Sequence, residues 1–242
     1  MDPASTSRHP PARSRHPDEL MTPGSRVVIA SGEGRYADPL HPFAATSLRV
    51  QAVLEDAGFV VVIDPDLDGA MTRLDGVDLL VINAGDPWKE PGDPPAAESI
   101  VGFGAALGRG IGLLGIHAAA ATMRDYPEWA EAFGAIWLPG LSGHPPIDLA
   151  RITITASHLG AGLDDFEVLD ERYSGLQRVG RSDIVATHAV DGVTCPTAWT
   201  RVVGRVRVAA DMLGHDERSY DSPGHRALLS SLARWASGAS RD

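Results

Sequence analysis

The segment IGLLGIHAAAA, residues 111–121, decides the fold class of this 242-residue chain. An apolar run ends at Ile116, His117 follows it, and four alanines come next. A short apolar run of this kind is typical of a buried strand. Small residues after the strand permit a tight turn into a helix, which is the local form of a nucleophile elbow. We therefore expect His117 to project from the carboxyl end of a buried strand.

Similar apolar segments precede this one and alternate with helical patterns. The predicted elements are strands over 27–30, 59–63 and 77–83, helices over 46–57 and 95–107, and a helix or turn over 67–74. Nearly continuous apolar strands that alternate with helices indicate a parallel sheet covered on both faces. We expect a flavodoxin-like three-layer α/β/α fold with the strand order 2-1-3-4 in this half.

The second half of the chain is less regular. The pattern predicts strands over 152–155, 166–169, 184–188, 197–201 and 205–210, and a closing helix over 222–236. The last two strands are expected to form a hairpin that turns at Val203-Gly204. This half should complete the sheet with a small antiparallel extension. Because no linker separates the halves, a single domain is predicted over residues 25–240.

Composition narrows the class of protein. The net charge is −11, so the surface repels phosphate backbones and a nucleic acid is not expected as a partner. The only cysteine, Cys195, cannot form a disulfide within the chain or a Cys-rich zinc site. No apolar run has the length of a membrane-spanning helix, and a cytoplasmic location is expected. Residues 1–24 contain five prolines and predict a disordered tail.

Polar residues that follow the predicted strands are the candidates for a functional site. Ligands of an open parallel sheet bind beyond the carboxyl ends of its strands. The residues in such positions are His41, Asp86, His117, His215 and Asp216. A histidine at an elbow is suited to general acid–base catalysis, metal binding or hydrogen bonding to a ligand, and a purely structural role is equally open.

Four blocks of the chain resemble successive blocks of the ThuA-like family, which is related to trehalose-utilisation proteins. The blocks are GLLGIHAAAAT (112–122), DYPEWAEAFGAIW (125–137), SHLGAGLDDFEVLDERY (157–173) and PTAWTRVVGRVRVAADMLGHDERSYDSP (196–223). The resemblance runs from about Arg26 to Gly238. It implies a class I glutamine-amidotransferase-like fold in which His117 stands at the nucleophile position. Because Cys195 lies far from that position, a Cys-nucleophile amidotransferase is disfavoured.

The resemblance also implies a role in carbohydrate metabolism, on disaccharides or their 3-keto forms. Glu171 matches the family's Asp-Glu-x-Tyr motif and is the best candidate for a carboxylate beside the histidines; a surface acid paired with arginine is the alternative. His144 matches a family histidine and is expected to face the same pocket. The family's His-Pro is replaced here by His158-Leu159, so His158 is interpreted as structural.

Three of the histidines suggest a metal site. His41, His117 and His215, with Glu171 beside them, supply the ligand types of a catalytic zinc site. No His-x-x-x-His pair fixes their geometry, so a divalent metal such as zinc stays a hypothesis.

The sequence context of several other residues is compatible with more than one role. Trp199, like Trp129 and Trp137, could stack on a sugar or lie in the core. His188 and His225 are interpreted as surface or helix residues.

Two functions remain open at this point. The first is an isomerase- or lyase-type proton transfer on a keto-sugar or disaccharide, with His117 or Glu171 as the base. The second is a non-catalytic sugar-binding or interaction protein that retains the fold. A serine hydrolase is disfavoured because no Gly-x-Ser-x-Gly pattern occurs. A small carbohydrate is the expected ligand, no membrane partner is expected, and a homo-oligomer is possible in either case.

Overall fold

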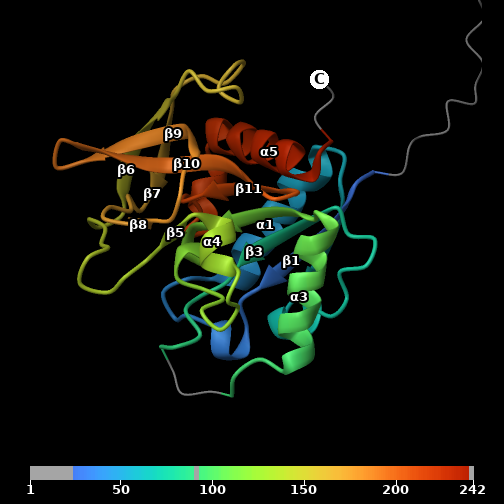
Figure 1. The fold of residues 1–242 in the computed structure, drawn as a ribbon. Helices are drawn as coiled ribbons and strands as arrows, with labels where there is room; N and C mark the ends of the chain where they lie inside the picture. The colour runs from blue at the N-terminus through green and yellow to red at the C-terminus, as the bar shows by residue number, and fades with distance from the viewer. Residues whose placement is uncertain (1–23, 90–92, 240–242) are drawn as a thin grey trace, which may run out of the picture.

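A computed structural model describes residues 24–89 and 93–239 of the chain. The predicted tail lies outside the described residues apart from Gly24. A nine-stranded sheet occupies the centre of the molecule, in the order β2-β1-β3-β4-β11-β10-β9-β6-β7 (Figure 1). The protein is thus a mixed α/β protein with one large sheet. None of the helices in the described ranges is long and apolar enough to cross a membrane.

The first half of the chain builds the parallel part of the sheet. Its strands are β1 (Arg26–Ser31), β2 (Val60–Asp64), β3 (Leu79–Asn83) and β4 (Gly112–Ile116). They pair in parallel in the order 2-1-3-4, as the sequence predicts. The strand β11 (Val206–Asp211) also pairs in parallel with β4. The carboxyl ends of these strands therefore lie along one edge of the sheet.

The second half adds antiparallel strands beyond β11. They are β10 (Val193–Val203), β9 (Asp183–Val190), β6 (Asp148–Ile154) and β7 (Phe166–Asp170). The predicted hairpin is present, because β10 and β11 pair up to Val203 and Val206. A separate two-stranded sheet joins β5 (Ala135–Ile136) to β8 (Gln177–Arg178). Two-residue strands such as these carry no periodicity, and the sequence did not predict them.

Helices pack on both faces of the sheet. The helices α1 (Phe43–Asp56) and α5 (Pro223–Ser237) pack on one face, against Leu79, Val81 and Leu114. The helices α2 (Leu67–Ala70), α3 (Ala97–Arg109) and α4 (Trp129–Phe133) pack on the other face, against Leu80, Ile82 and Leu113. Alternate strand residues point to opposite faces, so the strands are buried from both sides. In Figure 1, α5 and α3 lie on opposite sides of the sheet.

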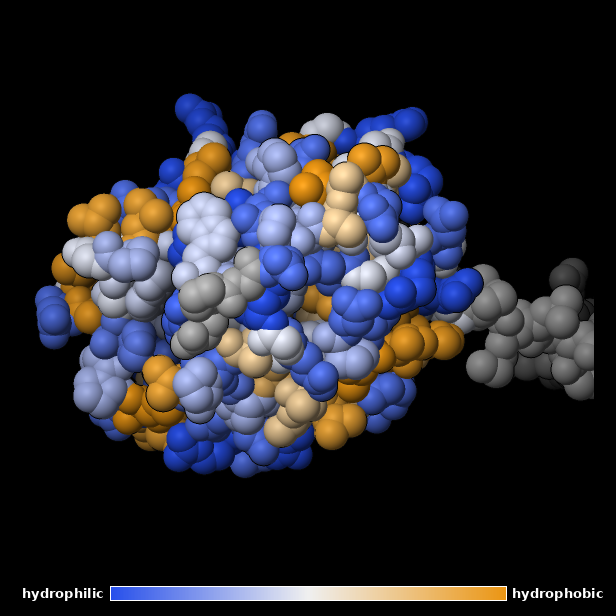
Figure 2. Space-filling model, turned by 90° about the horizontal axis from the view of Figure 1, so that it is seen from below, coloured by the Kyte–Doolittle hydropathy of each residue, from blue (hydrophilic) through white to orange (hydrophobic). Residues whose placement is uncertain are grey.

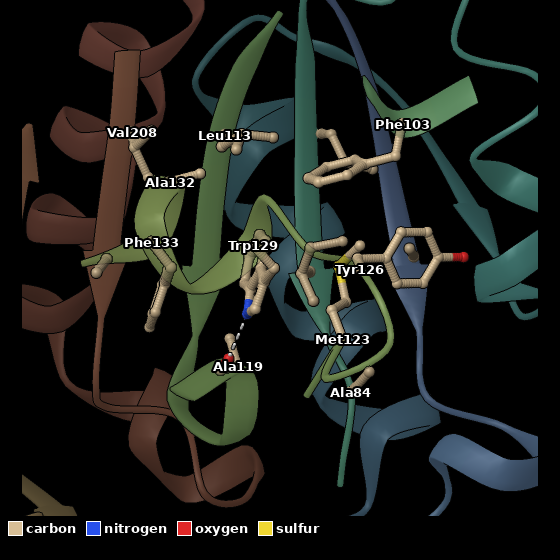
Figure 3. Packing of buried hydrophobic residues seen from close by; sticks show 14 of the residues in the cluster. Ala84, Phe103, Leu113, Ala119, Met123, Tyr126, Trp129, Ala132, Phe133 and Val208 are labelled. Carbon is tan, nitrogen blue, oxygen red and sulfur yellow. Dashed lines mark hydrogen bonds between the residues drawn. The ribbon is translucent and has the colours of Figure 1, made fainter. Parts of the chain in front are cut away.

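An aromatic cluster fixes the end of β4. The rings of Trp129 and Phe133 stack with centroids 5.1 Å apart, and Trp129 Nε1 donates to the carbonyl oxygen of Ala119 over 3.1 Å (Figure 3). Ala119 belongs to the short 3-10 helix η2 (His117–Ala120), which follows β4 directly. The core therefore anchors the turn that carries His117.

The surface seen in Figure 2 is mixed in character. Its hydrophobic side chains lie in small groups that hydrophilic side chains separate. Scattered groups of this kind are normal at a surface exposed to water.

Candidate functional site

His117 stands in a strained elbow at the end of β4. Its φ is 45°, in the left-handed region that residues other than glycine rarely adopt. Two residues earlier, Gly115 leaves room for Phe133 to pack on β4, because a Cβ there would lie 2.3 Å from the Phe133 ring. Strain of this kind costs on the order of 1–3 kcal/mol and clusters at functional sites. The elbow expected from the sequence is thus present, with the imidazole buried at the sheet edge.

Four side chains from distant segments meet at this elbow. They are His41, His117, Glu171 and His215, and one ligand atom from each lies within 4.8 Å of the others. His41 lies in the loop before α1, and His215 follows β11. Glu171 follows β7, at the far end of the sheet order. The residue that follows the last antiparallel strand therefore places its carboxylate beside the histidines.

Glu171 is the centre of this group. Its Oε2 lies 3.4 Å from His117 Nε2 and 3.3 Å from His215 Nδ1. Its Oε1 lies 3.3 Å from Nδ1 of a further histidine, His144. Tetrahedral ligands at zinc distances stand about 3.4 Å apart. The spacing of the carboxylate from His117 and His215 therefore matches that of ligands to one metal ion.

Hydrogen bonds fix the orientation of the His117 ring. Nδ1 lies 3.0 Å from the carbonyl oxygen of Met212, which can only accept, so Nδ1 carries the proton. Nε2 is then unprotonated, and it accepts from the hydroxyl of Tyr173 over 2.9 Å. Burial, together with the nearby Glu171 carboxylate, raises the pKa of the Tyr173 phenol well above its ordinary value. The phenol is therefore a proton donor at neutral pH.

His41 has the protonation state of a metal ligand. Its Nδ1 lies 3.2 Å from an Asp38 carboxylate oxygen, and Lys89 contacts the same carboxylate. Its Nε2 is buried and has no hydrogen-bond partner among residues 24–89 and 93–239. Burial lowers the pKa of His41 to about 4, and the neighbouring His117 also lowers it. The ring is therefore neutral at pH 7, with a free lone pair.

The carboxylate of Glu171 is ionised. Burial alone would raise its pKa, but the neighbouring imidazoles of His117 and His215 hold the pKa of Glu171 far below its ordinary value. Burial opposes the charged form of His215, but the Glu171 carboxylate raises the pKa of this histidine. An ionised carboxylate among three imidazoles has the donor set of a zinc or similar divalent-metal site.

A cavity of about 200 Å³ opens beside the cluster. Its lining includes His41, Tyr173, His144, Trp137, Asp86 and Lys89. A ligand in this cavity would therefore contact the histidine cluster, the aromatic rings of Trp137 and Tyr173, and several polar groups.

Three other predicted site residues lie in three different environments. Asp86 lines the cavity and accepts two hydrogen bonds from the Arg124 guanidinium, at 2.9 and 3.0 Å. Asp216 caps the 3-10 helix η3 (Glu217–Asp221) and pairs with Arg218. Trp199 is completely buried in the core and donates Nε1 to the carbonyl oxygen of Phe133 over 3.0 Å. Trp199 is thus not part of the cluster.

Two further histidines were expected on the surface or in a helix, and this expectation was wrong for His188. His188 is buried in β9, where Thr197 and the carbonyl oxygen of Tyr173 bind its ring. His225 lies in helix α5, as expected, but is completely buried rather than on the surface. Both buried rings form hydrogen bonds with polar partners. Hydrophobic periodicity in the sequence cannot reveal such partners. Cys195 is buried, as expected.

Sequence reasoning missed Asp170, which holds two parts of the site together. Asp170 is buried at the end of β7. Its carboxylate accepts hydrogen bonds from the backbone N–H groups of Gly214 (2.7 Å) and Glu171 (2.8 Å), and from Ser219 Oγ (2.5 Å). It therefore links Glu171 to the loop that carries His215. The only sequence signal was its place beside Glu171 in the Asp-Glu-x-Tyr motif.

Known structures with a similar fold were found. A protein from Parabacteroides merdae described as ThuA-like has 20% sequence identity and a TM-score of 0.73, with 90% of this chain and 91% of that chain covered. A second ThuA-like protein, from Bacteroides uniformis, has 15% identity and a TM-score of 0.69, with coverages of 92% and 95%. A Salmonella typhimurium protein described as cytoplasmic has 14% identity and a TM-score of 0.58, with coverages of 88% and 98%. At these identities the likeness concerns the fold.

The family comparison covers nearly all of the described chain. A comparison with curated proteins gave no match. The family ThuA, described as trehalose utilisation, matches residues 26–236, which include the elbow and every member of the histidine cluster. The chain therefore belongs to the ThuA family.

Proposed function

We propose that this protein is a metal-dependent enzyme that moves a proton on a disaccharide or keto-sugar. The observation that carries the proposal is the meeting of His41, His117, Glu171 and His215 within 4.8 Å. This donor set suits a divalent metal such as zinc, and a substrate oxygen from the cavity would be an additional ligand to the four side chains. The family's link to trehalose utilisation supports a carbohydrate substrate.

The proposed chemistry requires a polarised carbonyl and a base. A bound metal would act as a Lewis acid on the carbonyl oxygen of a keto-sugar, which acidifies the neighbouring C–H. In this scheme the role of His117 and Glu171 would be to bind the metal ion, and neither would remove the proton from the substrate. The base must lie in the cavity and be free of the metal. His144 meets both conditions, because it lines the cavity and only its Nδ1 faces Glu171 Oε1.

His144 and Glu171 form a carboxylate–histidine pair in this scheme. Nδ1 lies 3.0 Å from the carbonyl oxygen of Pro145, which can only accept, so Nδ1 carries the proton and Nε2 is the basic atom. The Glu171 carboxylate, 3.3 Å from Nδ1, would stabilise the imidazolium that proton transfer creates. Tyr173 is a neutral phenol that lines the same cavity. In this scheme its hydroxyl would give a proton to the substrate oxygen once His117 Nε2, its present acceptor, binds the metal.

The proposal assumes a flavodoxin-like three-layer arrangement around the site. The strand order 2-1-3-4 and the two cores on opposite faces of the sheet support this arrangement. Ligands of such sheets bind at the carboxyl ends of the strands, where the cluster lies.

Hydrogen–deuterium exchange tests the proposed reaction. Zinc-loaded protein would be incubated with a 3-keto-glucoside in D₂O, and loss of the proton signals next to the carbonyl would be followed by NMR. We expect exchange with the wild type, and losses of about 100-fold or more for His117→Ala and His144→Gln. His158→Ala is a matched control, because His158 is an exposed histidine that contacts Trp235 instead of the cavity.

The same assay distinguishes the proposed enzyme from a non-catalytic sugar-binding protein. Exchange by His117→Ala at the wild-type rate would overturn the assignment of the site. Sugar binding by the wild type without any exchange would favour the non-catalytic binding protein instead.

A further inference from the structure

A second cavity lies beside the first and has no role in the proposed reaction. It encloses about 250 Å³, and its lining includes Trp88, Thr122, Arg124, Tyr126 and Leu138. Each of the two cavities is smaller than the roughly 300–1,000 Å³ of a typical ligand pocket. Each therefore has room for one small ring rather than for a large ligand.

A single stretch of backbone separates the two cavities. In the segment 136–139, Ile136 and Leu138 line the second cavity, whereas Trp137 and Pro139 line the first. Successive side chains of an extended segment point to opposite sides, so a single backbone layer divides the cavities. The backbone N–H of Trp137 donates to the carbonyl oxygen of Ala120 over 2.8 Å, which holds this layer in place.

The two cavities share a border at their mouths. Asp86 and Lys89 line the first cavity, and Trp88, between them in the chain, lines the second. The Asp86 carboxylate binds the guanidinium of Arg124, which itself lines the second cavity. A ligand of two linked rings would therefore place one ring on each side of this ion pair.

An unpartnered polar group points to a ligand in the second cavity. The Thr122 side chain is buried, and its hydroxyl has no hydrogen-bond partner within residues 24–89 and 93–239. A buried hydroxyl without a partner is costly, so a ligand hydroxyl in the cavity would satisfy it.

The indole of Trp88 supplies a binding surface for a sugar ring. Trp88 is 63% exposed, although its Nε1 donates to Asp125 over 2.9 Å and the Arg124 guanidinium stacks 5.4 Å from its ring. These contacts hold an exposed aromatic face in one orientation. Aromatic faces with a polar handle are common where a ligand has both apolar and polar surfaces.

We infer that the second cavity is a subsite for the second monosaccharide unit of a disaccharide whose first unit occupies the cavity beside His41. This inference rests on the proposed function and names the substrate class of the same site. The ring in the second subsite stacks on Trp88, and one of its hydroxyls binds Thr122. The ion pair of Asp86 and Arg124 lies beneath the linkage between the two units.

Calorimetric titration of the zinc-loaded full chain tests the subsite. The probes are glucose and a panel of trehalose, maltose, sucrose and lactose. We expect at least one disaccharide to bind about tenfold more tightly than glucose, because it fills both cavities. Trp88→Ala and Thr122→Val should each remove most of that advantage and leave glucose affinity unchanged. Leu48→Ala is the control, because Leu48 is an exposed residue of α1 that lines neither cavity.

The possible failures are distinguishable. Equal affinity of the wild type for glucose and for every disaccharide would overturn the subsite and leave the proposed function standing. The same conclusion follows if the two variants weaken glucose and disaccharide to the same degree. Absence of binding by any of the five sugars would overturn the subsite, and the exchange assay with the 3-keto-glucoside then decides the proposed function separately. Far-ultraviolet circular dichroism confirms that each variant is folded before titration.

Discussion

His117 donates from Nδ1 to the main-chain carbonyl oxygen of Met212, 3.0 Å away. This bond fixes the tautomer, so that the unprotonated Nε2 accepts from the Tyr173 hydroxyl and lies 3.4 Å from Glu171 Oε2. A backbone carbonyl or carboxylate that orients a histidine in this way is usual at metal sites. His41 Nδ1 lies 3.2 Å from an Asp38 carboxylate oxygen. The hydrogen bond of His117 thus orients one of the four proposed ligands before any metal binds.

Replacement of His117 should separate backbone strain from metal binding. Glycine adopts a φ of 45° freely, whereas alanine does not. We expect both His117→Gly and His117→Ala to lose the metal. We also expect the glycine variant to be more stable by about 1 kcal/mol in urea unfolding. A glycine variant that is less stable than the alanine variant would contradict the strained elbow.

Asp170→Asn should weaken the site without removing a ligand. The buried Asp170 carboxylate binds Gly214, Glu171 and Ser219, and an amide can replace only part of these interactions. We expect a loss of about 2 kcal/mol in the free energy of unfolding, and a loss of about tenfold or more in zinc affinity. Competition with a chromogenic chelator measures the affinity. Asp164→Asn, an exposed neighbour, should change neither quantity.

The buried ion pair of His225 and Asp211 should make stability depend on pH. His225 Nδ1 lies 3.0 Å from the carbonyl oxygen of Ser219, and Nε2 lies 3.0 Å from the Asp211 carboxylate. Both ring nitrogens face acceptors, so the imidazolium is the bound form. Burial opposes this charge, but Asp211 raises the pKa of His225 above its ordinary 6.5.

The sign of the effect follows from the raised pKa. Protonation of His225 stabilises the folded state fully below the unfolded pKa, and this contribution is lost as pH rises through the folded pKa. The difference in unfolding free energy between the wild type and His225→Gln should therefore shrink as pH rises from 6. Urea unfolding at several pH values measures it. A difference that grows with pH would show that His225 is neutral in the folded state.

The parallel half of the sheet could be predicted because each of its strands is a short apolar run that is visible in the local sequence. Runs such as 79–82 and 111–116 have no polar side chain, and burial on both faces requires this pattern. The order of the antiparallel strands could not be predicted, because an alternating strand such as β6 fits many partners. The strands β5 and β8 depend on a contact between segments that are distant in the chain.

The candidate site was predictable only in part. The rule that ligands bind at the carboxyl edge of a parallel sheet selected His41, His117 and His215, which the structure brings together. Glu171 follows an antiparallel strand, to which that rule does not apply, and the family resemblance alone pointed to it. Trp199 lies in the core instead, because an indole with one backbone partner fits a packed interior as well as a sugar site.

Removal of a bound metal should destabilise the folded state. A ligand that binds only the native protein stabilises it by about 2.7 kcal/mol at a free concentration of 100 times Kd. We expect EDTA to lower the Tm of the zinc-loaded wild type and to leave the Tm of His41→Ala unchanged. An equal shift in both proteins would place the metal elsewhere.

The metal content of the purified, untagged chain tests the central claim most directly. Full-length protein would be incubated with zinc, passed through gel filtration and analysed by inductively coupled plasma mass spectrometry, alongside Glu171→Gln as an isosteric variant. The four-ligand site predicts about one zinc ion per chain in the wild type and a small fraction of that in the variant. A wild type with only traces of zinc, or a variant that retains as much metal as the wild type, would contradict it.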